Sequence, residues 1–490
     1  MSILRHSAWA AAAAIVLTGS RFAFVAIIAR RLSMTEFGQY AYGQWLADLS
    51  FLLCSLGATG AVGRYVAEFR NDPALTAAFI RRWLPFAIGL PWLAAAVVPL
   101  GAWLSGMSIG FYGLFWLVLW ALASGLWAMQ TAALSGLQRF DLIFFGNAVA
   151  AAILVGGALL LPSGSANTGQ VFALMALSCC CASLVGFSTT RRLAGHVPAE
   201  IIPARWRAMQ GYALNIWLSA LLWSLVWSRG EMPIVRAYLG DVGVAHYAAA
   251  LTLFGGGMQG VMLATSGVAP QLTRLWGEGS HTQALDLARR VMDVQLLVCG
   301  LAAIVLICFS PELMRLAFGG AYGAESGSLA ILSLGLVALA VSCQNHLLQI
   351  ATDARFSRDS TLLGLFVLFG SALLLVSVAG LAGAASARAG TMLVMAAVSL
   401  LVMHRRWGGA AYSGKNFAWV FLLVASCLAI QRLTADLHWF VRAGLCSVTA
   451  AVLVAAVRDE RGRTQTQVVL ERLRSALWPS RVATTQLDKP

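Results

Sequence analysis

Charged residues are scarce in this chain. Only 11% of its 490 residues are Asp, Glu, Lys or Arg, whereas 59% are hydrophobic and the mean hydropathy is +0.77. Soluble globular domains carry roughly a quarter of their residues as charges, so this composition excludes an ordinary water-soluble fold. We therefore expect an all-α polytopic membrane protein.

Motifs for metal, disulfide and glycosyl chemistry are lacking as well. The nine cysteines all lie in apolar stretches, with no C-x-x-C pair and no histidine cluster nearby. The chain has no D-x-D pair, and no carboxylates are arranged for glycosyl chemistry. We expect no disulfide, no metal, no cofactor and no enzymatic activity.

Apolar runs long enough for a hydrocarbon core of about 30 Å recur along the chain. Fourteen such runs can be counted, and we interpret the first as a retained helix rather than a cleaved signal peptide. The expected spans are 8–29, 40–62, 84–104, 111–133, 142–161, 170–190, 211–239, 244–268, 291–310, 328–350, 360–378, 384–403, 417–433 and 439–457.

The distribution of basic residues predicts the orientation. With a cytoplasmic N-terminus, the even-numbered turns and both tails hold 25 of the 34 Lys and Arg residues, against 4 at the odd-numbered turns. Cytoplasmic loops carry such an excess, so both termini are expected in the cytoplasm of a bacterial inner membrane. Topology accounts for most of the net charge of +14, and no nucleic-acid partner is expected.

The two halves of the chain show weak internal similarity. Residues 61–82 match 269–290 in length and in a terminal Arg-Arg pair, and residues 39–41 match 246–248 at nearly the same offset. A duplicated six-helix unit predicts two lobes related by a pseudo-two-fold along the membrane normal. The expected organisation comprises lobes at 1–205 and 206–410, two extra C-terminal helices in 411–457, and a cytoplasmic tail at 458–490.

The expected helix 211–239 carries unusual charges. Arg229, Glu231 and Arg236 interrupt a segment rich in Leu and Trp, and Pro233 lies between them. Ionisable residues within a membrane span usually face a bundle interior or a cavity, and proline is expected to kink the helix. This stretch is therefore a candidate substrate site. Alternatively, the charges mark the interfacial end of a shorter span.

Several segments resemble the bacterial polysaccharide (oligosaccharide) flippases, which belong to the superfamily that also contains multidrug extruders and lipid II flippases. They include ARRLSMTEFGQYAYGQ at 29–44, LGDVGVAHYAAA at 239–250 and LMRLAFGGAYGAESGSLAIL at 313–332. The family's A-R-x-L-x-x-x-x-F-G-x-Y stretch is matched by Ala29, Arg30, Leu32, Phe37, Gly38 and Tyr40. An acidic residue, usually Asp, is common in the seventh helix of this family, and Glu231 takes that place here.

The resemblance implies a flippase that works by alternating access. Its cargo would be an undecaprenyl-diphosphate-linked oligosaccharide for exopolysaccharide, capsule or O-antigen, with membrane lipid, a polysaccharide polymerase and export machinery as further partners. No bond would be made or broken.

The residue chemistry fits that cargo, because arginine binds phosphate oxygens through a planar fork and stays charged when desolvated. The candidates are Arg21, Arg229 and Arg236, the last two seven residues apart and so expected on one helix face. Asp48 and Glu231 are expected as counter-charges or proton carriers. Alternatively, Arg21 and Asp48 form only a structural ion pair.

Three rival functions remain. A cation-coupled multidrug extruder of the same fold would place carboxylates rather than arginines in its cavity. A membrane glycosyltransferase or polymerase would need a larger external loop than the longest one expected here, 311–327. A membrane scaffold would leave the charges of 211–239 unexplained. Two further arginines, Arg388 and Arg442, start their helices and are expected to snorkel to the interface.

Overall fold

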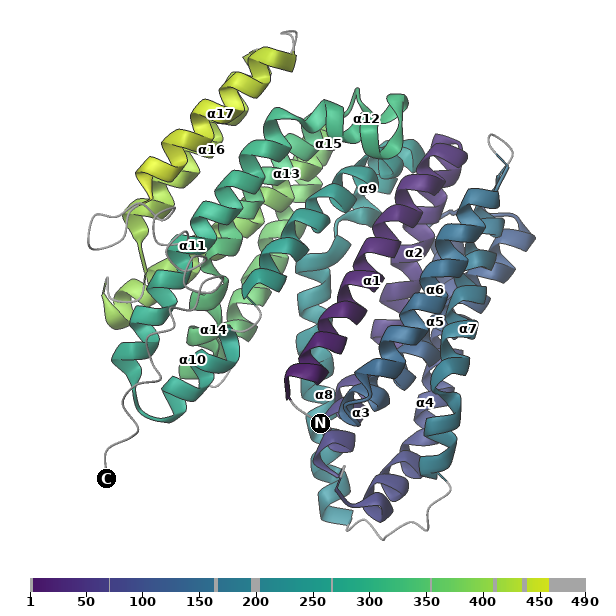
Figure 1. The fold of residues 1–490 in the computed structure, drawn as a ribbon. Coiled ribbons are helices and arrows are strands. Elements are labelled where there is room, and N and C mark those ends of the chain that lie inside the picture. Colours follow the sequence, from purple (N-terminus) through teal and green to yellow (C-terminus); the bar gives the residue numbers. More distant parts are fainter. Residues whose placement is uncertain are drawn as a thin grey trace, which may run out of the picture. The chain divides into compact units, whose positions relative to one another are not determined.

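The computed structural model describes residues 3–69, 71–162, 166–194, 203–265, 268–352, 355–408, 412–433 and 439–457. Every regular element within these ranges is helical (Figure 1). The expected all-α membrane fold is confirmed. The cytoplasmic tail expected at 458–490 lies outside the described residues.

The described residues up to Arg229 form eight helices and a π-helical turn. Their bounds are α1 Ile3–Arg31, α2 Met34–Cys54, α3 Ala58–Glu68, α4 Pro73–Leu104, α5 Phe111–Gly136, α6 Phe140–Leu160, α7 Thr168–Ala194, α8 Pro203–Ser224 and η1 Leu225–Arg229.

From Met232 onward, the part of the chain that the structure describes contains nine further α-helices and two short 3-10 segments. Their bounds are α9 Met232–Thr265, α10 Val268–Gly277, α11 His281–Cys308, α12 Ser310–Phe318, η2 Gly320–Tyr322, α13 Gly327–Ala338, η3 Leu339–Val341, α14 Ser342–Ala351, α15 Arg355–Trp407, α16 Gly414–Leu433 and α17 Trp439–Ala456.

Each of the fourteen expected spans coincides with helical residues. Among the described residues, nine helices are long and apolar enough to cross a membrane, or ten if α2 and α3, bent by 58°, form one broken span. One of the nine, α15, is 53 residues long and contains two expected spans on either side of a kink at Gly380. Gly380 has a φ of 58° and Gly240, which kinks α9, has a φ of 64°, so both hinges use a conformation that favours glycine.

The chain divides into two compact units. Unit 1 contains the residues up to Thr252 together with Met314–Tyr322 and Ala372–Leu381, and unit 2 contains Leu253–Leu313, Gly323–Ser371 and the residues from Ala382 onward. The repeat-based lobes 1–205 and 206–410 stay a prediction, because compactness does not test an internal symmetry.

Unit 1 is a helical bundle in which the chain bends between α2 and α3. In it α5 packs along α7, and α1 along α6 (Figure 1). Chain direction changes between α2 and α3 at Gly57, whose φ is 74°. A Cβ on Gly57 would lie 1.9 Å from the carbonyl oxygen of Ala213, so the missing side chain lets α8 approach this break closely. Trp217 of α8 then donates its indole N–H to the Leu52 carbonyl at the end of α2, at 2.9 Å.

Unit 2 is organised around α11, which packs against α13, α16 and α17.

The prediction that Arg388 and Arg442 of unit 2 snorkel to the membrane interface is wrong. Arg442 of α17 binds both carboxylate oxygens of Glu312 on α12, at 2.6 and 3.1 Å, and its side chain is 11% exposed. Arg388 is 2% exposed. Buried charges need polar partners rather than an aqueous interface, and the ion pair of Arg442 ties α17 to α12.

Candidate functional site

The segment between α8 and α9 is a discontinuous helix. After α8, the chain makes the π-helical turn η1, a two-residue turn at 230–231, and then a new helix from Met232. A Cβ on Gly230 would lie 2.0 Å from the carbonyl oxygen of Leu225, so the wide turn closes only over glycine. Pro233 lies in the first turn of α9, where its missing N–H costs no helical hydrogen bond. It starts a helix rather than kinking one, contrary to expectation.

Two arginines from different elements of unit 1 interact electrostatically with one carboxylate. Asp48 of α2 interacts electrostatically with Arg21 of α1 and then with Arg229 of η1. Tyr40 is fully buried on α2, about two turns before Asp48, and interacts electrostatically with all three residues. We call Arg21, Asp48 and Arg229 the charge cluster. It carries one net positive charge.

The charge cluster is accessible although it belongs to the bundle. The side chains of Arg21 and Asp48 are exposed and that of Arg229 is half-buried, whereas Tyr40 beneath them packs against Phe24 and Phe172. The structure thus brings together three of the five residues proposed from the sequence.

Glu231 lies apart in a fully buried position. Glu231 directly precedes α9, and the hydroxyl of Tyr247, beyond the kink of α9 at Gly240, donates to its Oε1 atom at 2.6 Å. The corresponding residue of the proposed repeat, Tyr40, donates instead to Gln44 at 3.1 Å. A carboxylate with 0% exposure cannot meet a bulky substrate without a rearrangement, so the geometry suits a counter-charge or proton carrier better than a direct ligand.

Arg236 does not share a face with Arg229. Seven residues would return to the same side of a straight helix, but the π turn and the break intervene. Arg236 instead donates to Asp241 at 2.8 Å and to the carbonyl oxygens of Ser105 and Gly106 at 2.9 and 3.3 Å. Its guanidinium also lies 4.5 Å from the ring centroid of Tyr42. These contacts join α9 to α2 and to the α4–α5 connection, and the substrate-binding role of Arg236 stays a prediction.

The family-like segments meet at the end of unit 1 where α1 joins α2. A Cβ on Gly38 would lie 1.9 Å from the carbonyl oxygen of Asp241, so two of these segments touch through backbone. Residues Met314–Tyr322, which we call the latch segment, accept hydrogen bonds from Arg30 through the carbonyls of Leu316 and Ala317. Tyr322 of the latch packs edge-on against Phe37, with ring centroids 5.8 Å apart.

The sequence alone predicts no role for this meeting point, although the matching motifs contain its parts. Arg30, Phe37 and Gly38 belong to the family-like segments, but nothing local in the sequence shows that Arg30 meets residues more than 280 positions away. The one local sign of a tight turn here is the pair Gly319-Gly320 just before Tyr322. Gly319 adopts a φ of 106°, a conformation that favours glycine.

No protein-family model and no curated protein matches this sequence. Solved structures do. The lipid II flippase MurJ, in an inward closed conformation, matches with a TM-score of 0.69 at 12% identity, over 96% of this chain and 100% of its own. An inward-facing MATE multidrug resistance transporter matches with a TM-score of 0.62 at 14% identity, over 84% of this chain and 95% of its own.

A third structure is a transporter of the MOP superfamily from Pyrococcus furiosus, described as having a binding pocket of reverse polarity. It matches with a TM-score of 0.58 at 15% identity, over 84% of this chain and 96% of its own. At these identities the likeness establishes the fold. The chain is a multi-pass membrane protein with the fold shared by these flippases and extruders.

Proposed function

We propose that the protein is a flippase that moves an undecaprenyl-diphosphate-linked oligosaccharide across the bacterial inner membrane by alternating access. The product would feed exopolysaccharide, capsule or O-antigen synthesis, with a polymerase and export machinery acting next. Both termini lie in the cytoplasm in this proposal. The protein acts as a transporter and not as an enzyme.

One observation carries the proposal: two arginines interact electrostatically with one carboxylate in the accessible charge cluster. A site with an excess of guanidinium groups attracts an anion, and a diphosphate offers several oxygens to a planar fork. Asp48 neutralises part of the positive charge while the site is empty. When the diphosphate enters, Arg21 and Arg229 exchange the carboxylate for phosphate oxygens, which gives the two states that transport requires.

A cation-coupled multidrug extruder of the same fold is the second candidate, because one matched structure is a multidrug resistance transporter. It would draw on Asp48 and Glu231 as cation or proton carriers. The balance of charge in the cluster favours the anionic cargo, since a cationic drug would meet two arginines beside Asp48.

The first experiment is mass spectrometry of membrane lipids after the protein is depleted from its native cells. We expect a diphosphate-linked oligosaccharide to accumulate and surface polysaccharide to be lost. The mass of the accumulated lipid would identify the glycan. Unchanged lipids with intact surface polymer would reject the flippase and favour the extruder, which drug-efflux assays would then test.

The second experiment assigns the charge cluster. Arg229→Ala should weaken phosphate binding roughly tenfold to hundredfold, since a hydrogen bond to a charged group contributes about 1.5–3 kcal/mol. Arg229→Lys should restore part of the export, because it keeps the charge and loses the fork. Arg358→Ala, an exposed arginine that pairs with its neighbour Asp359, is the control. Normal export by Arg229→Ala at wild-type membrane levels would overturn the site.

A further inference from the structure

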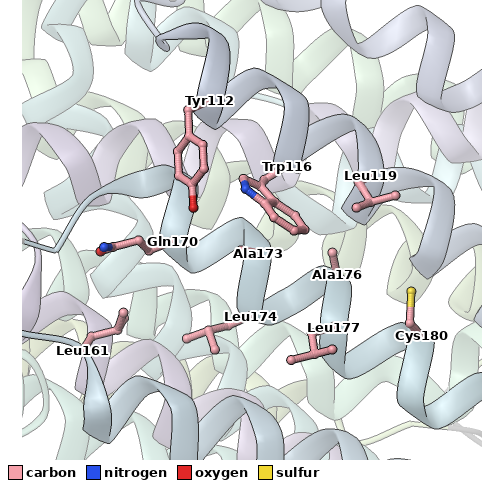
Figure 2. A pocket seen from close by; sticks show the side chains of 10 residues that line it. All are labelled: Tyr112, Trp116, Leu119, Leu161, Gln170, Ala173, Leu174, Ala176, Leu177 and Cys180. Carbon is pink, nitrogen blue, oxygen red and sulfur yellow. The ribbon is translucent and has the colours of Figure 1, made fainter.

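A groove opens on the side of unit 1 between α5 and α7. Its volume is about 430 Å³, within the range typical of ligand sites. Figure 2 shows Tyr112 and Gln170 at one end and Cys180 at the other. The groove follows α7 from Gln170 to Cys180, a rise of about 15 Å at 1.5 Å per residue. We call it the lateral groove.

The lateral groove is separate from the charge cluster. Helix α7 turns Phe172 inward, where it packs against Tyr40 and Trp120, and Cys179 interacts electrostatically with Arg21. The groove lies on another face of the same helix. Its floor contains Ala173 and Ala176, and the small side chains leave the hollow.

The surroundings of the lateral groove are apolar and exposed. Leu177 in its wall is 52% exposed, and Phe111, Phe115 and Leu160 close to its Tyr112 end are exposed too. In a membrane protein, large apolar side chains with such exposure face lipid. An elongated apolar hollow on that surface favours a hydrocarbon chain over water, because water needs polar partners.

Only one end of the lateral groove is polar. Gln170 accepts a hydrogen bond from the Asn167 backbone through Oε1, at 3.1 Å, which leaves its Nε2 group as a donor. Within the described residues, neither this Nε2 group nor the Tyr112 hydroxyl has a hydrogen-bond acceptor. Arg31 lies at the same end, where it donates to the carbonyl oxygen of Leu161 in the groove wall, at 3.1 Å.

We propose that the lateral groove holds one glycerophospholipid of the surrounding membrane. One acyl chain lies along α7 from Gln170 toward Cys180, and the ester oxygens accept hydrogen bonds from Tyr112 and Gln170. The phosphate lies near Arg31, so charge complementarity places the head at this end. The cargo is not involved, because α7 separates the groove from the charge cluster, and failure of the transport proposal would leave this inference standing.

Photo-cross-linking of the full-length protein tests the proposal. The protein is reconstituted into phosphatidylcholine vesicles that contain phosphatidylglycerol with a diazirine on one acyl chain, and the labelled peptides are mapped by mass spectrometry. We expect adducts to concentrate on residues 112–119 of α5 and 170–180 of α7. A parallel sample with a diazirine-bearing polyprenyl phosphate should label these residues less. Stronger labelling by the polyprenyl probe would overturn the choice of occupant.

Groove-filling variants provide the decisive comparison. Ala173→Leu combined with Ala176→Leu should lower the groove adducts at least about tenfold, which corresponds to 1.4 kcal/mol of lost binding. Gly156→Leu is the matched control, because Gly156 is exposed on α6 and a Cβ there meets no atom within 4 Å. Equal labelling of the filled variant and the control would refute the groove as a lipid site.

A milder variant keeps the test valid if the filled groove prevents folding. Tyr112→Phe retains the ring and removes one of the two donors proposed for the ester oxygens, so the acyl adducts should shift away from residues 170–174 or fall severalfold. Tyr238→Phe, at a tyrosine of similar exposure on α9, should not change them. Unchanged adducts in Tyr112→Phe would show that the polar end does not hold the lipid head, and the proposal would fail.

Discussion

The ion pair and hydrogen bonds of Arg236 predict that this residue stabilises the folded protein. The Arg236 and Asp241 side chains are only 10% and 13% exposed, and their ion pair measures 2.8 Å. Removing one partner of a buried pair typically costs about 3–5 kcal/mol, because the other charge stays buried without compensation. We expect Arg236→Ala to reach this range, since the variant also leaves the carbonyls of Ser105 and Gly106 without their donor.

The partner variant should be milder. In Asp241→Ala, Arg236 keeps its two carbonyl acceptors and its contact with Tyr42, so we expect about half the loss. The double variant should lose less than the sum of the single variants, with a coupling of about 1–3 kcal/mol, as for residues in one network.

The wild type, the two single variants and the double variant are compared by thermal unfolding of the purified protein in detergent, followed by intrinsic fluorescence. The control is Arg274→Ala, whose ion pair with Glu278 is 3.7 Å long and mostly exposed, so its loss should be under about 1 kcal/mol. Arg236→Ala as stable as this control would refute the structural account. Loss of export without loss of stability would instead support the substrate role predicted for Arg236 from the sequence.

Two further predictions concern the discontinuous helix. Gly230→Ala should destabilise the protein by about 1–3 kcal/mol and impair export, because the new Cβ collides with the Leu225 carbonyl; Gly211→Ala in open space on α8 is the control, and equal behaviour in unfolding and export assays would argue against a required π turn. Tyr247→Phe should cost about 1.5–3 kcal/mol by removing the donor to buried Glu231, and an unchanged unfolding temperature would contradict the importance of this hydrogen bond.

Hydropathy predicts the helices well where a span is continuous and apolar. The expected span 111–133 matches α5, and 142–161 matches α6, within a few residues. Hydropathy does not detect helical residues that lie outside the apolar run. Helix α11 begins at His281, ten residues before the expected span 291–310, because its first turns are amphipathic rather than apolar.

Breaks inside a span are harder to predict. The expected span 40–62 is divided between α2 and α3, and 328–350 contains the 3-10 turn η3 at Leu339–Val341. A hydropathy average does not respond to a change of backbone geometry that leaves the side chains apolar. Gly57 is the one sequence signal at the first break, and the second break has no glycine or proline within it.

The discontinuity at 225–231 explains why the charges of this segment separate into different environments. A straight helix would place Arg229 and Arg236 on one face and direct both toward the same partner. The π turn holds more residues per turn than an α-helix, which changes the direction in which the following side chains point. The break at 230–231 then separates α9 from α8, so α9 does not continue the helical register of α8. Arg229 consequently interacts with Asp48, whereas Arg236 is occupied by Asp241. Variants of Arg229 should therefore act on transport and those of Arg236 on stability, a distinction that residue spacing alone does not contain.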